Sequence, residues 1–219
     1  MAEVYKVVTQ TVIFLGEPTE ETDKIMIALC SDQSSTSADL PYESLLSRPW
    51  FSRVWIYQEL VLSRDPWIQC GQHKIRWEKL YALTKERTAT KKGLRSWDSF
   101  LHMTKGRKRW RQMQTSAESP TPAARILLDT LIVRRGMGVF DPRDMLFAHL
   151  GVVDVQSGDG ETKKLLKVDY NKPAEQVYTD LAHYLCVASL PVDLFRVLSY
   201  VDESYCQKRE KHIPSWVPD

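Results

Sequence analysis

A run of aromatic residues with a single carboxylate, LLSRPWFSRVWIYQELVL from Leu45 to Leu62, most constrains how this chain can fold. Pro49 suits the first turn of a helix, where a backbone donor is not needed. Beyond it the apolar residues recur at helical spacing, which predicts an amphipathic helix over Trp50–Leu62. Glu59 falls on the apolar face of this helix. A charge buried there is costly unless it has a partner, so Glu59 needs an explanation.

Two interpretations of Glu59 are possible from the residues alone. In the first, Glu59 lies at the edge of the helix and pairs with Arg53, with Arg48 or with a basic residue elsewhere in the chain. In the second, Glu59 is a catalytic carboxylate, and its apolar, aromatic surroundings raise its pKa. The sequence pattern leaves both interpretations open.

Composition limits the classes of protein to consider. The chain has 219 residues, of which 43% are hydrophobic, and this is enough for one large domain or a domain with an appendage. The net charge of +2 does not favour binding of polyanions by overall charge. No apolar run has the length of a membrane span or of a signal-peptide core, which predicts a cytoplasmic protein. The scattered cysteines predict reduced thiols and no metal site; they are Cys30, Cys70, Cys186 and Cys206.

The N-terminal part predicts a small sheet with helices. Thr11–Leu15 is continuously apolar, as in a strand of a parallel sheet that helices cover on both faces. A helix is expected over Glu21–Cys30. Trp67–Cys70 is a second strand, and His73–Ile75 comes after it across a turn as in a hairpin. An amphipathic helix is then expected over Trp77–Thr88. The predicted fold class is therefore α/β, rich in helices and with a small parallel sheet.

The segment Lys91–Arg111 contains eight basic residues and one acidic residue, with aromatic side chains between them. Such a segment can form a nucleic-acid surface, because cations follow the phosphate backbone while rings stack on bases. The alternative is a solvated loop and helix that link two subdomains. We favour the link, because the segment is short and carries no nucleic-acid-binding motif. Together with Ser116–Pro122, which has the composition of a linker, it defines a basic linker region over residues 91–122.

The remaining residues, 123–219, predict a mainly helical region. Asp141 is the expected cap of a helix, with Pro142 at its first position and Asp144 near the positive end of its dipole. This helix is expected to cover Met145–Leu150 and to end at Gly151. A further helix is predicted over residues 173–188. Arg143 is a candidate for a salt bridge that anchors one subdomain to the other.

Six segments of the chain resemble, in the same order, parts of the fungal heterokaryon incompatibility (HET) domain and of the region C-terminal to it. Residues 48–63 and 70–80 resemble the middle of that domain, and residues 4–26 resemble the segment that precedes the middle. The later segments that match are RRGMGVFDPRDMLFAHLGVVD, VDYNKPAEQVYTDLAHYLC and IPSWVPD. The resemblance implies that residues 1–90 are the C-terminal part of a HET domain and that 123–219 are an associated helical region. Its structural motif residues are Arg48, Pro49, Trp50, Asp141, Pro142, Arg143 and Asp144.

The HET domain is itself similar to the Toll/interleukin receptor (TIR) domain, which has a flavodoxin-like fold. TIR domains that cleave NAD carry a helix with the pattern S-x-W-C-x-x-E-L, in which the glutamate is catalytic. The residues Ser52 to Leu60 of this chain resemble it, with the serine one position further away and isoleucine in place of cysteine. The resemblance implies Glu59 as the catalytic residue and Ser52 and Trp55 as substrate-binding residues.

The chemistry implied by this resemblance needs no metal and no cofactor, with NAD as the substrate. Cleavage of the nicotinamide–ribose bond builds positive charge on the ribosyl ring, and a nearby carboxylate stabilises that charge as it develops. The same oxygens can hold the ribose hydroxyls, as carboxylates do in glycoside hydrolysis.

Full HET domains carry two earlier motifs, close to S-Y-x-W-G and W-I-D-x-x-C-I-N-Q, and this chain begins after both. The expected result is an incomplete TIR-like sheet with an exposed edge that favours association. A glutamate without a nucleotide pocket contributes little to a reaction, so a truncated chain is expected to be inactive by itself.

The leading hypothesis is a HET-domain protein of fungal nonself recognition and programmed cell death. It is expected to act through assembly or signalling with a protein partner, by self-association or with a chain that completes its sheet. The alternatives are an NAD glycohydrolase that uses Glu59 and a nucleic-acid-binding module that uses Lys91–Arg111.

Overall fold

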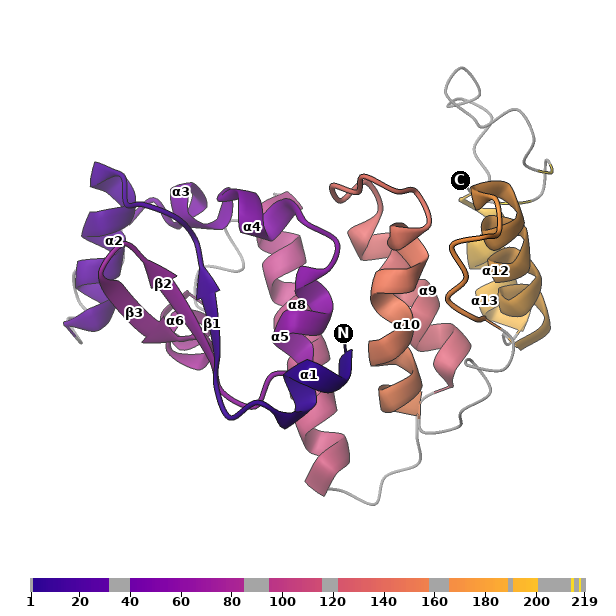
Figure 1. Cartoon of the computed structure of the whole chain (residues 1–219), viewed down its shortest axis with the longest axis horizontal. Helices are drawn as coiled ribbons and strands as arrows, with labels where there is room; N and C mark the ends of the chain where they lie inside the picture. The colour runs from indigo at the N-terminus through magenta and orange to yellow at the C-terminus, as the bar shows by residue number, and fades with distance from the viewer. Residues whose placement is uncertain are drawn as a thin grey trace. The chain divides into compact units, whose positions relative to one another are not determined.

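A computed structural model describes residues 2–31, 40–84, 95–115, 122–157, 166–188 and 191–200, together with residues 214 and 217. The chain divides into two compact units, Met1–Gln114 and Thr115–Asp219 (Figure 1). The boundary falls inside the region 91–122 that the sequence predicted as a basic linker. The assignment of each unit to a part of a HET domain stays a prediction.

The first unit contains a small sheet and short helices. Its strands are β1 (Thr11–Phe14), β2 (Pro66–Cys70) and β3 (His73–Arg76). Its helices are α1 (Ala2–Val7), α2 (Glu20–Cys30), α3 (Tyr42–Leu46), α4 (Pro49–Ser52), α5 (Ile56–Val61), α6 (Trp77–Thr84) and α8 (Arg95–Thr115). The second unit contains α9 (Ala123–Arg134), α10 (Asp144–Ser157), α12 (Ala174–Ala188) and α13 (Pro191–Leu198).

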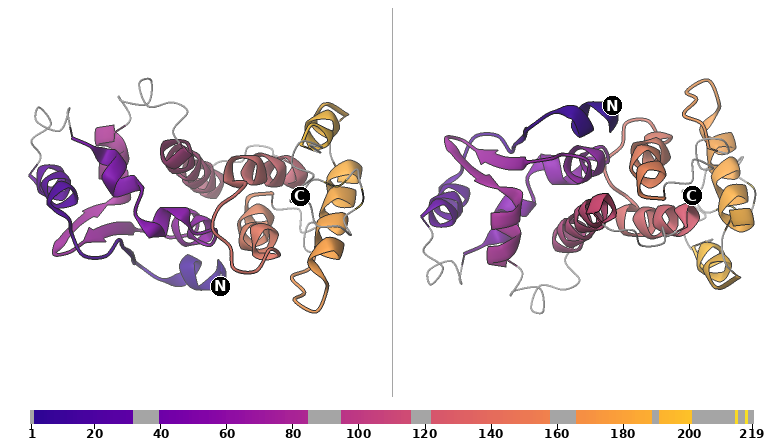
Figure 2. Two further views of the ribbon diagram at one scale, coloured as in Figure 1. Left: turned by 90° about the horizontal axis from the view of Figure 1, so that it is seen from above. Right: turned by 90° about the horizontal axis from the view of Figure 1, so that it is seen from below.

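The sheet has the strand order β1-β2-β3, with β1 parallel to β2 and β3 antiparallel to β2. The predicted helix-rich α/β fold with a small sheet is therefore confirmed, and the hairpin of β2 and β3 makes the sheet mixed. Ile13, Ile68 and Ile75 lie opposite one another across the three strands and are buried. Helices α2 and α6 pack on β2 and β3, and Figures 1 and 2 show α2 alongside this hairpin. The isoleucine row is the centre of the core under these helices.

The prediction that β1 is buried on both faces is wrong. Ile13 is buried, but Val12 is 44% exposed and Phe14 is 54% exposed. Successive side chains of a strand point to opposite faces, so these two residues share the face opposite to Ile13. The apolar run of β1 has the composition of a strand covered on both sides, whereas in this chain one side of it is open.

The prediction of one continuous helix over Trp50–Leu62 is also wrong. Helix α4 ends at Ser52, and Arg53 has an extended backbone with φ −77° and ψ 143°. The amide of Arg53 donates to the carbonyl of Trp50, which closes a tight turn. The break turns Trp50 inward, where its ring lies edge-on to that of Phe51 with centroids 5.1 Å apart. The gain from burying two large rings explains why packing overrides the helical pattern here.

Helix α8 packs in the first unit through its aromatic and polar side chains. The ring of Phe100 lies 4.9 Å from that of Trp77, and both residues are buried. The indole of Trp77 donates a 3.2 Å hydrogen bond to the hydroxyl of Thr104, which is also buried. Part of the segment predicted as a linker thus contributes to the core, while residues 91–94 and 116–121 lie outside the described part of the chain.

The second unit is mainly helical, as predicted, and α9 packs against α10. Helix α10 differs from the prediction, because it continues through Gly151 to Ser157. Its apolar residues Phe147 and Val153 are buried on both sides of Gly151, and burial of these side chains explains why the helix continues. Near the C-terminus, Val217 is buried against Ala182.

Candidate functional site

The carboxylate of Glu59 is partly buried and has two described partners. Its Oε2 accepts a 2.9 Å hydrogen bond from the indole Nε1 of Trp50, and its Oε1 lies 4.0 Å from Nη2 of Arg53. The side chain is 17% exposed, compared with 58% for that of Arg53. The helix break between α4 and α5 places these partners beside Glu59. Of the pairings that the sequence left open for Glu59, the one with Arg53 is confirmed.

Helix α1 adds Tyr5 to the surroundings of Glu59. Burial raises the pKa of the Tyr5 phenol, the negative charge of Glu59 raises it further, and Arg53 lowers it. This coupling places the phenol within electrostatic reach of the carboxylate, in agreement with the contact between α1 and α5. The carboxylate therefore contacts an indole and a guanidinium group, and its charge acts on a nearby phenol.

The two predicted substrate-binding residues lie at the break between the helices. Ser52 is exposed, and its hydroxyl donates a 2.8 Å hydrogen bond to the carbonyl of Pro49. Trp55 is half-buried and precedes α5, and its carbonyl accepts the amides of Gln58 and Glu59. Trp55 thus starts the helix that carries Glu59. Sequence reasoning missed the direct contact of Trp50 with Glu59, because a continuous helix does not bring residues nine positions apart together.

Arg48 is not described as a partner of Glu59, which was one of the predicted pairings. Its Nη2 donates a 2.9 Å hydrogen bond to the hydroxyl of Thr22. Thr22 and Thr19 form a capping box at the start of α2, so Arg48 ties this helix to the start of α4. Pro49 occupies the first turn of α4, as predicted.

In the second unit, Asp144 lies in the first turn of α10, as predicted, while the predicted cap Asp141 takes part in a polar cluster just before the helix. Arg143 binds the carboxylate of Asp141 with two nitrogens, Nε at 2.9 Å and Nη2 at 2.7 Å. Its Nη1 donates to the carbonyls of Tyr170 and Lys172. The hydrogen bond from Arg143 lowers the pKa of Asp141. Every described partner of Arg143 belongs to the second unit.

The helix begins at Asp144, because the Asp141 carboxylate accepts the amide of Arg143 at 3.0 Å and holds a turn before the helix. The hydroxyl of Tyr170 donates a 2.6 Å hydrogen bond to Asp144. Burial and then this bond raise the pKa of Tyr170 to about 12. The hydroxyl of Tyr178 donates to the carbonyl of Pro142 at 2.8 Å. The four residues of this motif thus join the start of α10 to the segment leading into α12.

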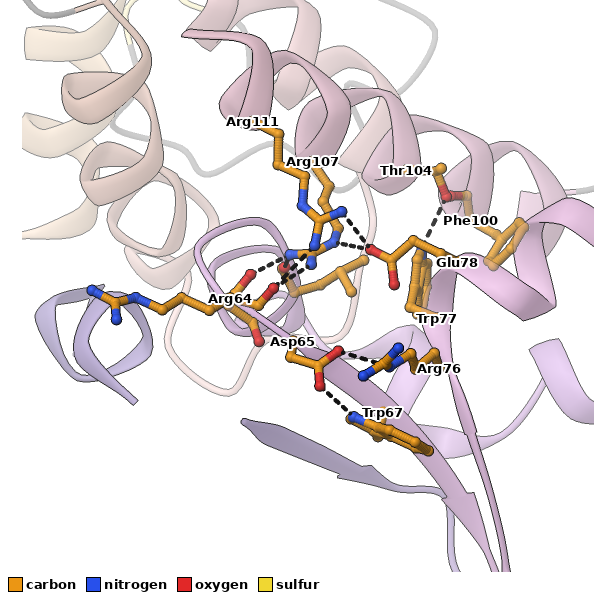
Figure 3. A network of polar contacts seen from close by, with 12 residues as sticks. Arg64, Asp65, Trp67, Arg76, Trp77, Glu78, Phe100, Thr104, Arg107 and Arg111 are labelled. Carbon is orange, nitrogen blue, oxygen red and sulfur yellow. Dashed lines mark hydrogen bonds and ion pairs between the residues drawn. The ribbon is translucent and has the colours of Figure 1, made fainter. Parts of the chain in front are cut away.

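Arg107 forms the most extensive buried polar network of the described first unit (Figure 3). Its side chain is 3% exposed, and its Nε donates a 2.9 Å hydrogen bond to Glu78. Its other nitrogens donate to the carbonyls of Leu60, Ser63 and Arg64, at and just after the end of α5. Burial lowers the pKa of Arg107, and Glu78 raises it. Arg107 satisfies the free carbonyls at the end of the helix that carries Glu59.

Other basic residues of α8 also bind groups within the unit. Arg111 donates a 3.0 Å hydrogen bond to the carbonyl of Arg64 and lies 3.3 Å from Glu78. Lys108 donates to the hydroxyl of Tyr81. The nucleic-acid alternative depended on these cations, and these contacts compete with phosphate for them. Lys91 and Lys92 lie outside the described residues.

Comparisons with models of protein families, with curated proteins and with solved structures found no match. The described residues contain no group of three or more His, Cys, Asp or Glu side chains placed to hold a metal ion. In the same part of the chain, no helix has both the length and the apolar character needed to cross a membrane.

Proposed function

We propose that this chain is a HET-type protein of fungal nonself recognition and programmed cell death that acts by assembling with another polypeptide at β1. The family and the biological setting come from the sequence resemblance. Assembly at β1 is inferred from one observation. The strand has the composition of one covered on both faces, but Val12 and Phe14 are exposed.

The outer edge of β1 supports this proposal. Among the described strands, β1 pairs with β2 alone. The amides of Thr11 and Leu15 donate to the carbonyls of Asp65 and Gln69, on the side of β2. Backbone groups alternate in direction along a strand, so those of Val12 and Phe14 point away from β2. An added strand would pair with these groups, as in β-strand addition.

The open face of the sheet supports the same conclusion. Val12 lies opposite Trp67, which lies opposite Arg76. The guanidinium carbon of Arg76 and the amine of Lys74 lie 5.1 Å and 4.9 Å from the centre of the Trp67 ring. The face therefore combines apolar groups near β1 with cations near β3. It suits a partner surface that is apolar at its centre and acidic at one side.

The experiment is to place a charge on β1 and to measure assembly by sedimentation over a range of protein concentrations. Lysine at an edge strand opposes strand addition. The double variant Val12→Lys/Phe14→Lys should remain a monomer under conditions in which the unmodified chain assembles. The control is Ile27→Lys, since Ile27 on α2 is 47% exposed, close to the exposure of Val12. Equal assembly of the β1 variant and the unmodified chain would refute the proposal.

NAD hydrolysis is a second candidate function, and the position of Glu59 favours it. The carboxylate is held by an indole hydrogen bond and is mostly withdrawn from solvent. A positioned carboxylate of this kind can stabilise positive charge that develops on a ribosyl ring.

The test of NAD hydrolysis is release of nicotinamide from NAD by the assembled protein. Glu59→Gln should abolish the release. Asp65→Asn is a matched control, because Asp65 also accepts an indole hydrogen bond, from Trp67 at 2.8 Å. Equal rates for Glu59→Gln and the unmodified protein would remove Glu59 from the reaction.

A further inference from the structure

The first unit also contains a concave site whose chemical character differs from that of the surroundings of Glu59. A pocket of about 590 Å³ lies where α1, the segment after α5 and α8 meet. Its lining residues are Lys6, Leu62, Ser63, Arg64, Trp110 and Arg111. Glu59 is not among them, and neither is any residue of β1. A volume in this range accommodates a small organic ligand.

The charge around this pocket is positive. Lys6, Arg64 and Arg111 contribute three cations, and Arg107 lies directly behind the segment that carries Arg64. Glu78 supplies a carboxylate beside these cations, and it binds Arg107 and Arg111. Asp65 is nearby, but its carboxylate binds Trp67 and Arg76. The excess of positive charge favours the binding of an anion in this pocket.

Arg64 is the cation best placed to bind such an anion. Its carbonyl is fixed by Arg107 and Arg111, each at 3.0 Å, so the backbone from which the side chain extends is held in place. The exposed guanidinium group has no partner among the described residues. Figure 3 shows this side chain extending away from Arg107 and Glu78. A guanidinium group presents two parallel donors to a phosphate.

Ser63 supplies an independent indication of a ligand. The residue lines the pocket and is 2% exposed, and its buried hydroxyl has no described hydrogen-bond partner. A buried hydroxyl without a partner destabilises a protein by about 1–3 kcal/mol, so such groups are rare unless something else binds them. Trp110, half-buried at the same pocket, offers a flat apolar ring.

We infer that this pocket binds a small organic phosphate, with its phosphate groups at Arg64, Lys6 and Ser63 and its ring against Trp110. A nucleoside diphosphate has these two parts at a suitable size. A longer polynucleotide fits less well, because the basic residues of α8 are partly engaged within the fold. The inference does not depend on assembly at β1 or on Glu59.

The experiment is isothermal titration calorimetry at low salt with ADP, pyrophosphate, adenosine and a single-stranded oligonucleotide. ADP and pyrophosphate should bind saturably, and adenosine should not. Arg64→Glu should weaken ADP binding by about tenfold or more, since it replaces an attraction by a repulsion. Arg109→Glu should change it by less than about twofold. Arg109 is exposed on α8 and does not line the pocket, so it controls for overall charge.

Two further variants separate the parts of the ligand. Trp110→Ala should weaken the binding of ADP but leave the binding of pyrophosphate unchanged. Ser63→Ala should weaken the binding of both ligands. It should not lower the stability of the free protein, because the Ser63 hydroxyl has no described partner to lose.

Three results would overturn the inference. The first is the absence of saturable binding of both ADP and pyrophosphate to the folded protein. The second is an equal loss of binding in Arg64→Glu and Arg109→Glu, which would indicate attraction by overall charge. The third is tighter binding of the oligonucleotide than of ADP with equal sensitivity to both variants, which would indicate an extended nucleic-acid surface.

Discussion

The indole Nε1 of Trp50 donates a 2.9 Å hydrogen bond to the carboxylate of Glu59, nine positions further along the chain. The bond crosses the break between α4 and α5, and it explains how a carboxylate is accommodated in an aromatic environment. Arg53 adds an ion pair, in which its Nη2 lies 4.0 Å from Oε1 of the same carboxylate. The structure thus gives Glu59 a partner whether or not the residue takes part in a reaction.

This hydrogen bond predicts energetic coupling between the two residues. In a double-mutant cycle with Trp50→Phe and Glu59→Gln, the coupling should be roughly 1.5–3 kcal/mol, as expected for a partly buried hydrogen bond to a charged group. Urea unfolding measures it. The same cycle with Trp67→Phe and Asp65→Asn is the control, and it should give a smaller value because the Asp65 side chain is 32% exposed. A coupling near zero between Trp50 and Glu59 would contradict the geometry.

Arg107 is predicted to be essential for the stability of the first unit. Arg107→Lys retains the charge but cannot reproduce the bonds to Glu78 and to the carbonyls at the end of α5. The variant should lose about 3–5 kcal/mol in the free energy of unfolding, because buried acceptors lose their partner. Arg111→Lys, at a side chain that is 50% exposed, should lose less than about 1 kcal/mol. Similar losses of unfolding free energy in the two variants would contradict the prediction that the buried bonds of Arg107 stabilise the first unit.

Gly106 predicts a steric effect that a second substitution relieves. A Cβ atom at this position would lie 2.5 Å from the hydroxyl of Tyr57, which is buried. Gly106→Ala should therefore destabilise the protein by about 1–3 kcal/mol, although alanine is the better helix former. Tyr57→Phe removes the clashing oxygen and should recover part of the loss when combined with it. Thermal unfolding of the two single variants and the double variant measures this, and additive losses would contradict the proposed contact.

The pair of Asp141 and Arg143 predicts a dependence of stability on pH. The hydrogen bond from Arg143 holds the pKa of Asp141 in the folded protein below the ordinary value for an aspartate. A group of this kind contributes stability above its unfolded pKa, and the contribution is lost as the pH falls through the folded pKa. Unfolding followed between neutral pH and pH of about 2 should show Asp141→Asn less stable than the unmodified protein at neutral pH, with the difference disappearing in acid. A difference in stability between the two proteins that stays constant over this pH range would refute a lowered pKa of Asp141 in the folded protein.

The sequence predicted features that depend on local patterns. The β-branched run of β1 and the turn at Gly71, where φ is 53°, were enough to predict the strands and the hairpin. The break at Arg53 was not predicted, because burial of Trp50 and Phe51 decides it and burial depends on distant residues. Arg107 was counted as one of several basic residues, since no local pattern distinguishes a buried arginine. The open face of β1 was missed for the same reason, because composition does not show whether a strand is covered.

Amide hydrogen exchange along β1, followed by NMR as the protein concentration rises, tests the central claim most directly. The amides of Val12 and Phe14 point away from β2, whereas those of Thr11 and Leu15 are bonded on the side of β2. Assembly by strand addition should slow the exchange of Val12 and Phe14 as the assembled species forms, and should change that of Thr11 and Leu15 much less. If the protein assembles while Val12 and Phe14 exchange as fast as in the monomer, assembly at β1 is contradicted.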